Sequence, residues 1–229
     1  MADLPHTAIE DYAVIGDMET CALVNRDGSV DWLCLPRFDS PSSFTAVLGS
    51  PDNGRWLIGP QDVARASRRY VGSSFVLETT HETDSGVVRV TDAMPTGDGR
   101  ADIVRVVEGV SGTVRMEHEW VVRFGYGKVT PWVSRDVGPG GPDDRLITAV
   151  AGPDMLVLRG DRLPKAADGR HCDVFDVSGG RLSRSRRHGS PRTCPCPRPP
   201  TSHRPSRPPR SSGRSGPTAA HTTALTATR

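Results

Sequence analysis

Long apolar runs are missing from this chain of 229 residues. No segment approaches the roughly 18 consecutive apolar residues that a membrane-spanning helix requires. The chain begins MADLPHTAIEDYAV, which contains neither the basic segment nor the apolar core of a secretory signal. These absences argue against a protein with helical membrane spans and predict a cytoplasmic protein without a membrane partner.

Familiar catalytic and metal-binding motifs are missing as well. The chain contains no HExxH zinc motif, no nucleophile elbow and no recognisable Ser/His/Asp arrangement. Its five cysteines are irregularly spaced, and Cys194-Pro-Cys196 lacks the two-residue gap of a zinc-binding pair. We therefore expect reduced cysteines, no catalytic residue, no metal and no cofactor.

The last part of the chain, residues 181–229, lacks acidic residues, lysine and aromatic side chains. It holds eleven Arg and nine Pro, and its large aliphatic residues are Leu182 and Leu225. Such a segment cannot bury enough apolar surface to offset a backbone entropy cost of about 1–2 kcal/mol per ordered residue. The composition predicts a disordered basic tail, rich in Arg, Pro, Ser and Thr. It follows a folded domain, residues 1–180, whose net charge is −9.

The charge of this tail would suit a nucleic acid, because arginine neutralises phosphate groups. However, the tail has no aromatic side chain that could stack on bases, and it has no lysine. We therefore do not expect nucleic acid as the main partner. Binding of nucleic acid or of another partner through the tail remains an alternative function.

Alternating apolar and polar residues dominate between residues 20 and 178 and predict strands. Cys21–Val24 runs into the turn Asn25-Arg-Asp-Gly28, where Gly28 suits a left-handed conformation, and a return strand follows. Further strands are predicted at residues 55–58, 68–71, 75–83, 87–91, 103–107, 114–124, 145–150, 155–158 and 174–177. The fold class is thus all-β, a large antiparallel β-sandwich of the supersandwich kind with one short helix.

The short helix is expected to begin at Pro41 and to end at Gly49, with Phe44, Val47 and Leu48 on its buried face. Later in the chain, Gly125-Tyr-Gly127 could suggest a phosphate-binding loop. It follows a strand, but no helix pattern comes after it, so a phosphate cradle would lack its structural context. We interpret it as a loop where two backbones approach each other.

Glu117, His118 and Glu119 could suggest a catalytic or metal-binding cluster. On a strand, however, Glu117 and Glu119 share one face, whereas His118 points to the other. We interpret the two glutamates as part of a solvent-facing strand surface.

Asp31 is unusual, because it lies between Val30 and Trp32 on a strand with apolar residues on both faces. A buried carboxylate costs free energy unless it is hydrogen-bonded or paired. Two hypotheses remain open. Asp31 is either a structural partner of a backbone N–H or of Arg37, or a contact at a domain interface or the rim of a sugar pocket.

Five blocks of the sequence together resemble a known family. They are IEDYAVIGDMETCALVNRDGSVDWLCLPRFDSPSSFTAVLG at residues 9–49, GRWLIGP at 54–60, RRYVGSSFVLETTHETDSGVVRVTDAMP at 68–95, VRVVEGVSGTV at 104–114 and RFGYGKVTPWV at 123–133. In this order they resemble the amino-terminal part of bacterial glycoside hydrolase family 15 proteins, the glucoamylase- and trehalase-like enzymes. The resemblance covers roughly residues 9–178.

The resemblance implies an amino-terminal β-sandwich that packs against a carboxy-terminal (α/α)6 barrel. Two glutamates of the barrel would cleave α-glucosidic bonds with inversion, one as acid and one as base. Neither glutamate can be placed on this chain, because the resemblance ends near residue 180. The expected partner is therefore a catalytic barrel that this chain lacks, with contact to trehalose or an α-glucan at the interface. The candidates for that interface or for a sugar-pocket rim are Asp31, Trp32, Arg37, Phe38 and Asp39.

The abrupt change of composition near residue 180 suggests a frameshift, because the bias of the tail is typical of GC-rich DNA read out of frame. The predicted function is that of the non-catalytic amino-terminal domain of a trehalase- or glucoamylase-like hydrolase, truncated and inactive alone. A free-standing carbohydrate-binding module is one alternative. An enzyme restored by a separately encoded barrel is another.

Overall fold

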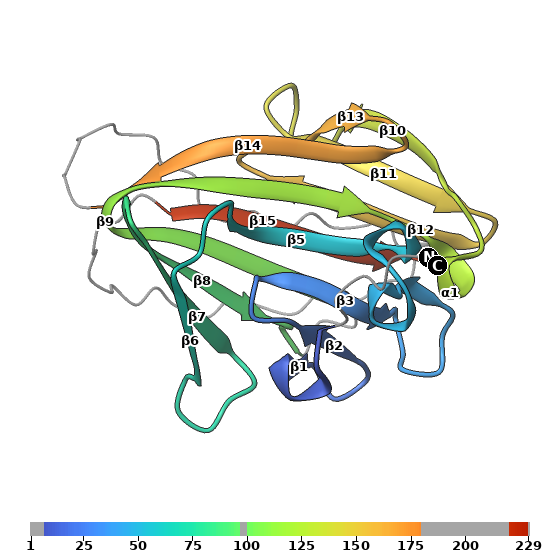
Figure 1. Cartoon of the computed structure of the whole chain (residues 1–229). Coiled ribbons are helices and arrows are strands. Elements are labelled where there is room, and N and C mark those ends of the chain that lie inside the picture. The colour runs from blue at the N-terminus through green and yellow to red at the C-terminus, as the bar shows by residue number, and fades with distance from the viewer. Residues whose placement is uncertain (1–6, 97–99, 180–219, 229) are drawn as a thin grey trace, which may run out of the picture.

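A strand of 21 residues, β9 (Ala101–Val121), belongs to two antiparallel sheets that form a β-sandwich (Figure 1). The structure, a computed structural model, describes residues 7–96, 100–179 and 220–228. Buried side chains from both sheets belong to a single apolar cluster. The predicted all-β antiparallel fold is therefore confirmed.

The strands divide between the two sheets as follows. The first sheet contains, in order across it, β1 (Ala13–Gly16), β2 (Cys21–Val24), β3 (Ser29–Cys34), β5 (Arg55–Pro60), the second half of β9, β14 (Arg170–Ser178) and β13 (Lys165–Ala167), with β4 (Ser42–Phe44) paired to β3. The second contains β6 (Arg65–Tyr70), β7 (Leu77–Thr83), β8 (Gly86–Ala93), the first half of β9, β15 (Ala220–Thr228), β12 (Asp154–Gly160), β11 (Arg145–Ala151) and β10 (Trp132–Val137).

The helical elements are short. They are the 3-10 turns η1 (Ile9–Asp11), η2 (Ala46–Leu48) and η3 (Pro51–Asn53), and the four-residue α1 (Phe124–Gly127). None of the helices in the described ranges has the length and apolarity that crossing a bilayer demands.

The change of sheet within β9 takes place at residues 109–112, between the two predicted strands 103–107 and 114–124, which the structure joins into one. Before this point β9 pairs with β8 and β15, and after it β9 pairs with β5 and β14. Gly112 has φ +65°, and a Cβ atom built on it would lie 2.1 Å from the carbonyl oxygen of Ser85. At this corner, where β9 passes from one sheet to the other, residue 112 must be glycine. Its backbone has a positive φ, and the turn between β7 and β8 approaches it too closely for a side chain.

We expect Gly112→Ala to lower the free energy of unfolding by at least about 2 kcal/mol, because alanine disfavours positive φ and its methyl group would meet backbone. Urea unfolding of the full chain measures this difference. Ser111→Ala is the matched control, since Ser111 is an exposed neighbour, and it should stay within about 0.5 kcal/mol of the original. Equal stability of the two variants would contradict this account of the corner.

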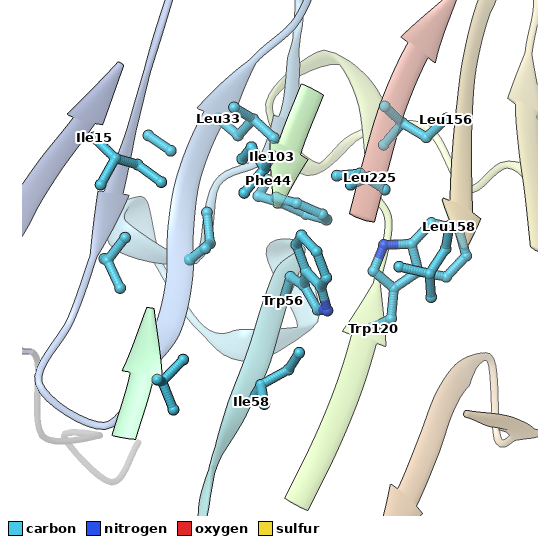
Figure 2. Packing of buried hydrophobic residues seen from close by; sticks show 14 of the residues in the cluster. Ile15, Leu33, Phe44, Trp56, Ile58, Ile103, Trp120, Leu156, Leu158 and Leu225 are labelled. Atoms are coloured by element: carbon cyan, nitrogen blue, oxygen red, sulfur yellow. The ribbon is translucent and has the colours of Figure 1, made fainter. Parts of the chain in front are cut away.

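The apolar core lies between the sheets (Figure 2). Trp56 of β5 and Trp120 of β9 are fully buried on the first sheet, and Leu158 of β12 and Leu225 of β15 are fully buried on the second. Full burial of a large aliphatic side chain stabilises a fold by about 1.5–3 kcal/mol. The interlocking of these side chains therefore fixes how the two sheets face each other.

A charged pair lies inside this core. Arg105 of β9 and Asp92 of β8 both have fully buried side chains, and Arg105 Nε donates to Asp92 Oδ1 at 2.8 Å. The same guanidinium donates to the carbonyl oxygen of Trp56, in β5 of the first sheet, at 2.8 Å and to that of Gly28, in the turn before β3, at 2.6 Å. Its Cζ also lies 5.1 Å from the centre of the Trp56 ring. Arg105 thus ties the two sheets together by polar contacts.

The helix predicted after Pro41 is wrong. Residues 42–44 form the strand β4, in which Phe44 pairs with Leu33 and is fully buried, and a single 3-10 turn follows. Pairing with β3 satisfies the backbone of this segment and buries Phe44 more completely than one helical turn could. Leu48, expected on the buried face, is 68% exposed.

Disorder was predicted for all of residues 181–229, and for residues 220–228 this is wrong. They form β15, which fills the space between β9 and β12 and buries Leu225 completely. The alternation around Thr223 and Leu225 supplies a period of two, and hydrogen bonding to two neighbouring strands offsets the low apolar content. Residues 181–219, including Cys194 and Cys196, lie outside the described residues.

Candidate functional site

Three loops gather at one end of the sandwich, which we call the α1 end (Figure 1). They span residues 35–54, 122–131 and 164–169, because β3 and β9 end there while β5 and β14 begin there. Direct contacts join the loops. The backbone N–H of Tyr126 donates to Ser42 Oγ at 2.8 Å, and Arg123 donates to the carbonyl oxygen of Gly169 at 3.2 Å.

The loop that contains α1 has a strained backbone. Gly125, Tyr126 and Gly127 have φ values of +60°, +62° and +82°, so three consecutive residues are left-handed. For Tyr126 this conformation costs of order 1–3 kcal/mol. The turn places the Tyr126 ring 6.0 Å from the ring of Trp32 and leaves 52% of Tyr126 exposed. Such strain is concentrated at functional sites, and here it presents an aromatic side chain at the surface.

The predicted residues of loop 36–41 also lie at this end. Arg37 Nε donates to Asp39 Oδ1 at 3.0 Å, and Arg37 lies 3.8 Å from a carboxylate oxygen of Glu19. The hydrogen bond to Asp39 raises the pKa of Arg37, which keeps it charged. Exposed pairs of this kind contribute little to stability. Phe38 is 71% exposed, so the pairs shape a loop that presents an apolar ring to solvent.

Asp31 is separate from the other predicted residues. Its side chain is buried and accepts hydrogen bonds from Tyr12 Oη and Asn25 Nδ2, both at 2.9 Å, and from Ser29 Oγ at 2.5 Å. Burial raises the pKa of Asp31 above its usual range. These partners secure the hairpin between β2 and β3. The structure therefore brings Trp32, Arg37, Phe38 and Asp39 to one end and leaves Asp31 in a structural environment.

Five exposed apolar side chains lie in the turns at the α1 end or next to it. The exposed fractions are 96% for Met18, 71% for Phe38, 68% for Leu48, 52% for Tyr126 and 45% for Val129. We call these five residues the apolar cluster. The sequence pattern identified Phe38 but missed the others, because they lie in turns without a period. For Met18, Tyr126 and Val129 the signal was indirect, because they are large apolar residues outside every predicted strand and helix. Leu48 was missed because it was assigned to the buried face of the predicted helix.

A pocket of about 400 Å³ lies beside the apolar cluster, between the start of β10 and the hairpin of β13 and β14. Sequence reasoning did not find it, because its walls come from three separate segments. Among the side chains that line it are Trp120, Arg123, Trp132, Asp168, Arg170 and His171. Trp132 is 88% exposed, whereas Trp120 is buried and meets the His171 ring edge-on at 5.8 Å.

A network of charges lies behind this pocket. Glu119 is 3% exposed and is bound by Arg55 at 2.5 Å and by Arg170 at 2.7 Å, and Arg170 also pairs with Asp52. The predicted solvent-facing surface is therefore wrong for Glu119, because two arginines from β5 and β14 compensate its burial. The hydrogen bond to Glu119 raises the pKa of Arg170, whereas burial lowers the pKa of His171. Glu119 thus serves as a structural partner that holds Arg55 of β5 and Arg170 of β14 together.

Comparison with known proteins identifies the class. A family model described as trehalase-like, N-terminal matches residues 4–138, more than half of the chain, and the chain belongs to this family. No solved structure matches the chain.

The chain is similar to proteins that are named trehalases. The chain is 36% identical over 146 residues to the trehalase of Mycolicibacterium smegmatis, covering 55% of this chain and 22% of that protein. It is 37% identical over 142 residues to the trehalase of Mycobacterium tuberculosis, covering 53% and 21%. It is 37% identical over 84 residues to trehalase 2 of Sulfolobus acidocaldarius, covering 37% and 14%. The chain therefore spans about a fifth of the length of the mycobacterial trehalases.

Proposed function

We propose that this chain is the non-catalytic amino-terminal domain of a trehalase- or glucoamylase-like enzyme of glycoside hydrolase family 15, and that a catalytic domain docks on its α1 end. The observation that carries the proposal is the apolar cluster. Large apolar side chains exposed in one region of a surface commonly mark an interaction site. The partner is a folded catalytic domain, because about four fifths of the length of the matched trehalases lies outside the part that this chain covers.

The chemistry of such an enzyme would lie on the partner. Inverting hydrolysis of an α-glucoside requires two carboxyl groups, about 6.5–9.5 Å apart, on either side of the scissile bond. At the α1 end the buried Glu119 is neutralised by arginines, and Asp39 is paired with Arg37. We therefore assign no bond-breaking role to this chain and expect it to be inactive alone. Its role would be to support and orient the catalytic domain through the apolar cluster.

Substitution at the centre of the apolar cluster tests the docking surface. The full chain would be titrated calorimetrically with the part of the M. smegmatis trehalase that it does not match, after circular dichroism has shown that part to be folded. We expect saturable binding. We also expect Phe38→Asp to weaken it at least about tenfold, because the carboxylate of the new aspartate would lose its water where the Phe38 ring contacts the partner.

Phe75→Asp is the matched control. Phe75 is 60% exposed in the turn between β6 and β7, which lies well away from α1 (Figure 1). The control variant should bind like the original chain. Loss of binding in Phe75→Asp with unchanged binding in Phe38→Asp would place the interface elsewhere and contradict the proposal.

A further inference from the structure

We propose that the pocket between β10 and the β13–β14 hairpin binds one pyranose ring of a neutral α-glucoside, with Trp132 as the surface on which the ring stacks. The choice of an α-glucoside rests on the proposed function, whereas the pocket and its sugar-like chemistry do not. A volume of about 400 Å³ falls in the range of small-molecule sites, roughly 300–1,000 Å³.

Trp132 supplies the apolar surface. It begins the edge strand β10, whose six residues are all exposed, and 88% of the Trp132 side chain faces solvent. An indole of this size is usually largely buried, so its exposure beside a pocket indicates a contact surface for another molecule. The flat face of the indole matches the C–H face of a pyranose. Behind it, Trp120 and Val122 form an apolar floor.

Arg123 and Asp168 supply polar groups for hydroxyls. The guanidinium of Arg123 is fixed by hydrogen bonds to the carbonyl oxygens of Val122 at 2.8 Å and Gly169 at 3.2 Å. These bonds use two of its five N–H donors, which leaves donors for neighbouring sugar hydroxyls. Asp168 lies on the same wall, in the left-handed turn of the hairpin with φ +49°, and its exposed carboxylate can accept hydroxyl protons. Vicinal hydroxyls of a pyranose present this alternation of donor and acceptor.

The charge balance favours a neutral ligand. Arg123 and Arg170 line the pocket, but Asp168 lines it as well, and Arg170 is already paired with Glu119 and Asp52. The Arg170 guanidinium is therefore compensated by carboxylates, and Asp168 adds a negative charge to the wall that also contains Arg123. A phosphorylated sugar or another anion would meet the Asp168 carboxylate as well as Arg123, so the site would not favour an anion over a neutral sugar.

The pocket also lies at the margin of the apolar cluster, since loop 122–131 contributes to both. The family match ends at residue 138, so Trp132 and Arg123 lie inside the matched region and Asp168 and Arg170 lie outside it. The site therefore combines a wall within the family region with a wall from the later hairpin. Sugar binding at this position would bring an α-glucoside to the border with the docked domain.

The test uses the nitrogen-15-labelled full chain alone, without any trehalase partner. The chain has four tryptophans, so the indole N–H signal of Trp132 can be assigned from its loss in Trp132→Ala. Titration with trehalose and with maltose should shift the Trp132 signal saturably. Trp132→Ala should weaken binding at least tenfold without changing the thermal unfolding midpoint.

Val137→Ala is the matched control, because Val137 is exposed on the same strand but does not line the pocket. It should bind both sugars like the original chain. No saturable shift with either sugar, or binding that survives in Trp132→Ala, would overturn the proposal. Preference for glucose 6-phosphate over trehalose would also overturn it, because the site would then select an anion. Failure here would leave the docking experiment unaffected, since Phe38 and the trehalase partner take no part in it.

Discussion

Arg105→Met should lower the free energy of unfolding by about 3–5 kcal/mol, because it leaves the buried carboxylate of Asp92 without its partner. Asp92 is fully buried, and Arg105 is the cation that the structure places against it, at 2.8 Å. The substitution also removes two hydrogen bonds to the carbonyl oxygens of Trp56 and Gly28. Since those bonds connect the two sheets, the loss affects the whole sandwich. Urea unfolding followed by circular dichroism measures the difference.

The double variant Arg105→Met with Asp92→Leu separates the charge from the inter-sheet bonds. Replacing a whole buried pair by apolar residues is often close to neutral, so the double variant should recover much of the lost stability. Recovery should be incomplete, because the carbonyl oxygens of Trp56 and Gly28 still lose their donor. A double variant less stable than Arg105→Met alone would contradict the assignment of the loss to an unpaired Asp92.

Stability should also fall steeply between pH 6.5 and pH 4, because two histidines are buried in their neutral form. Burial, and secondarily the charge of Arg105, lowers the pKa of His81 to about 4 and that of His118 to about 3. Nε2 of His118 accepts a hydrogen bond from Trp56 Nε1 at 3.0 Å, which requires an unprotonated nitrogen. In the unfolded chain both groups take up protons near pH 6.5.

The direction of the effect follows from where the protons bind. Above pH 6.5 His81 and His118 are unprotonated in both the folded and the unfolded chain. Their contribution to the free energy of unfolding is then at its full value. As the pH falls below 6.5 the unfolded chain gains protons that the folded chain does not, at a cost of about 1.4 kcal/mol per pH unit for each histidine. By pH 4 each has removed about 3 kcal/mol. The raised pKa of Asp31 acts in the opposite direction and offsets part of this loss.

Urea unfolding at a series of pH values between 7.5 and 4.5 measures this slope. In His81→Leu the slope should decrease by about 1.4 kcal/mol per pH unit, because one proton fewer separates the two states. His118, with its partner Trp56, would account for the slope that remains. An unchanged slope in His81→Leu would show that His81 already binds a proton in the folded chain, and the account of the buried histidines would fail.

Most of the fold could be predicted from local pattern. The alternation in Val87–Thr91 and in Arg145–Val150 falls within observed strands, and the predicted left-handed glycine of the first hairpin, Gly28, has φ +85°. These features depend on neighbouring residues alone. They are therefore visible in one sequence.

The failures share a long-range cause. Glu119 was expected at the surface because its partners, Arg55 and Arg170, are 64 and 51 residues away in the chain. β15 was missed because the composition of residues 181–229 suggested disorder. Its backbone hydrogen bonds come from β9 and β12, which lie far away in the chain. The pocket beside Trp132 combines residues from three separate segments. None of these contacts leaves a local pattern.

Hydrogen exchange of the full chain with the unmatched part of the M. smegmatis trehalase tests the central claim most directly. Mass spectrometry would compare backbone exchange with and without the partner. We expect new protection in residues 36–54 and 122–131, which belong to the α1 end, and unchanged exchange in the turn at residues 71–76. Protection confined to residues 71–76, or no protection in a mixture that binds, would contradict docking on the α1 end.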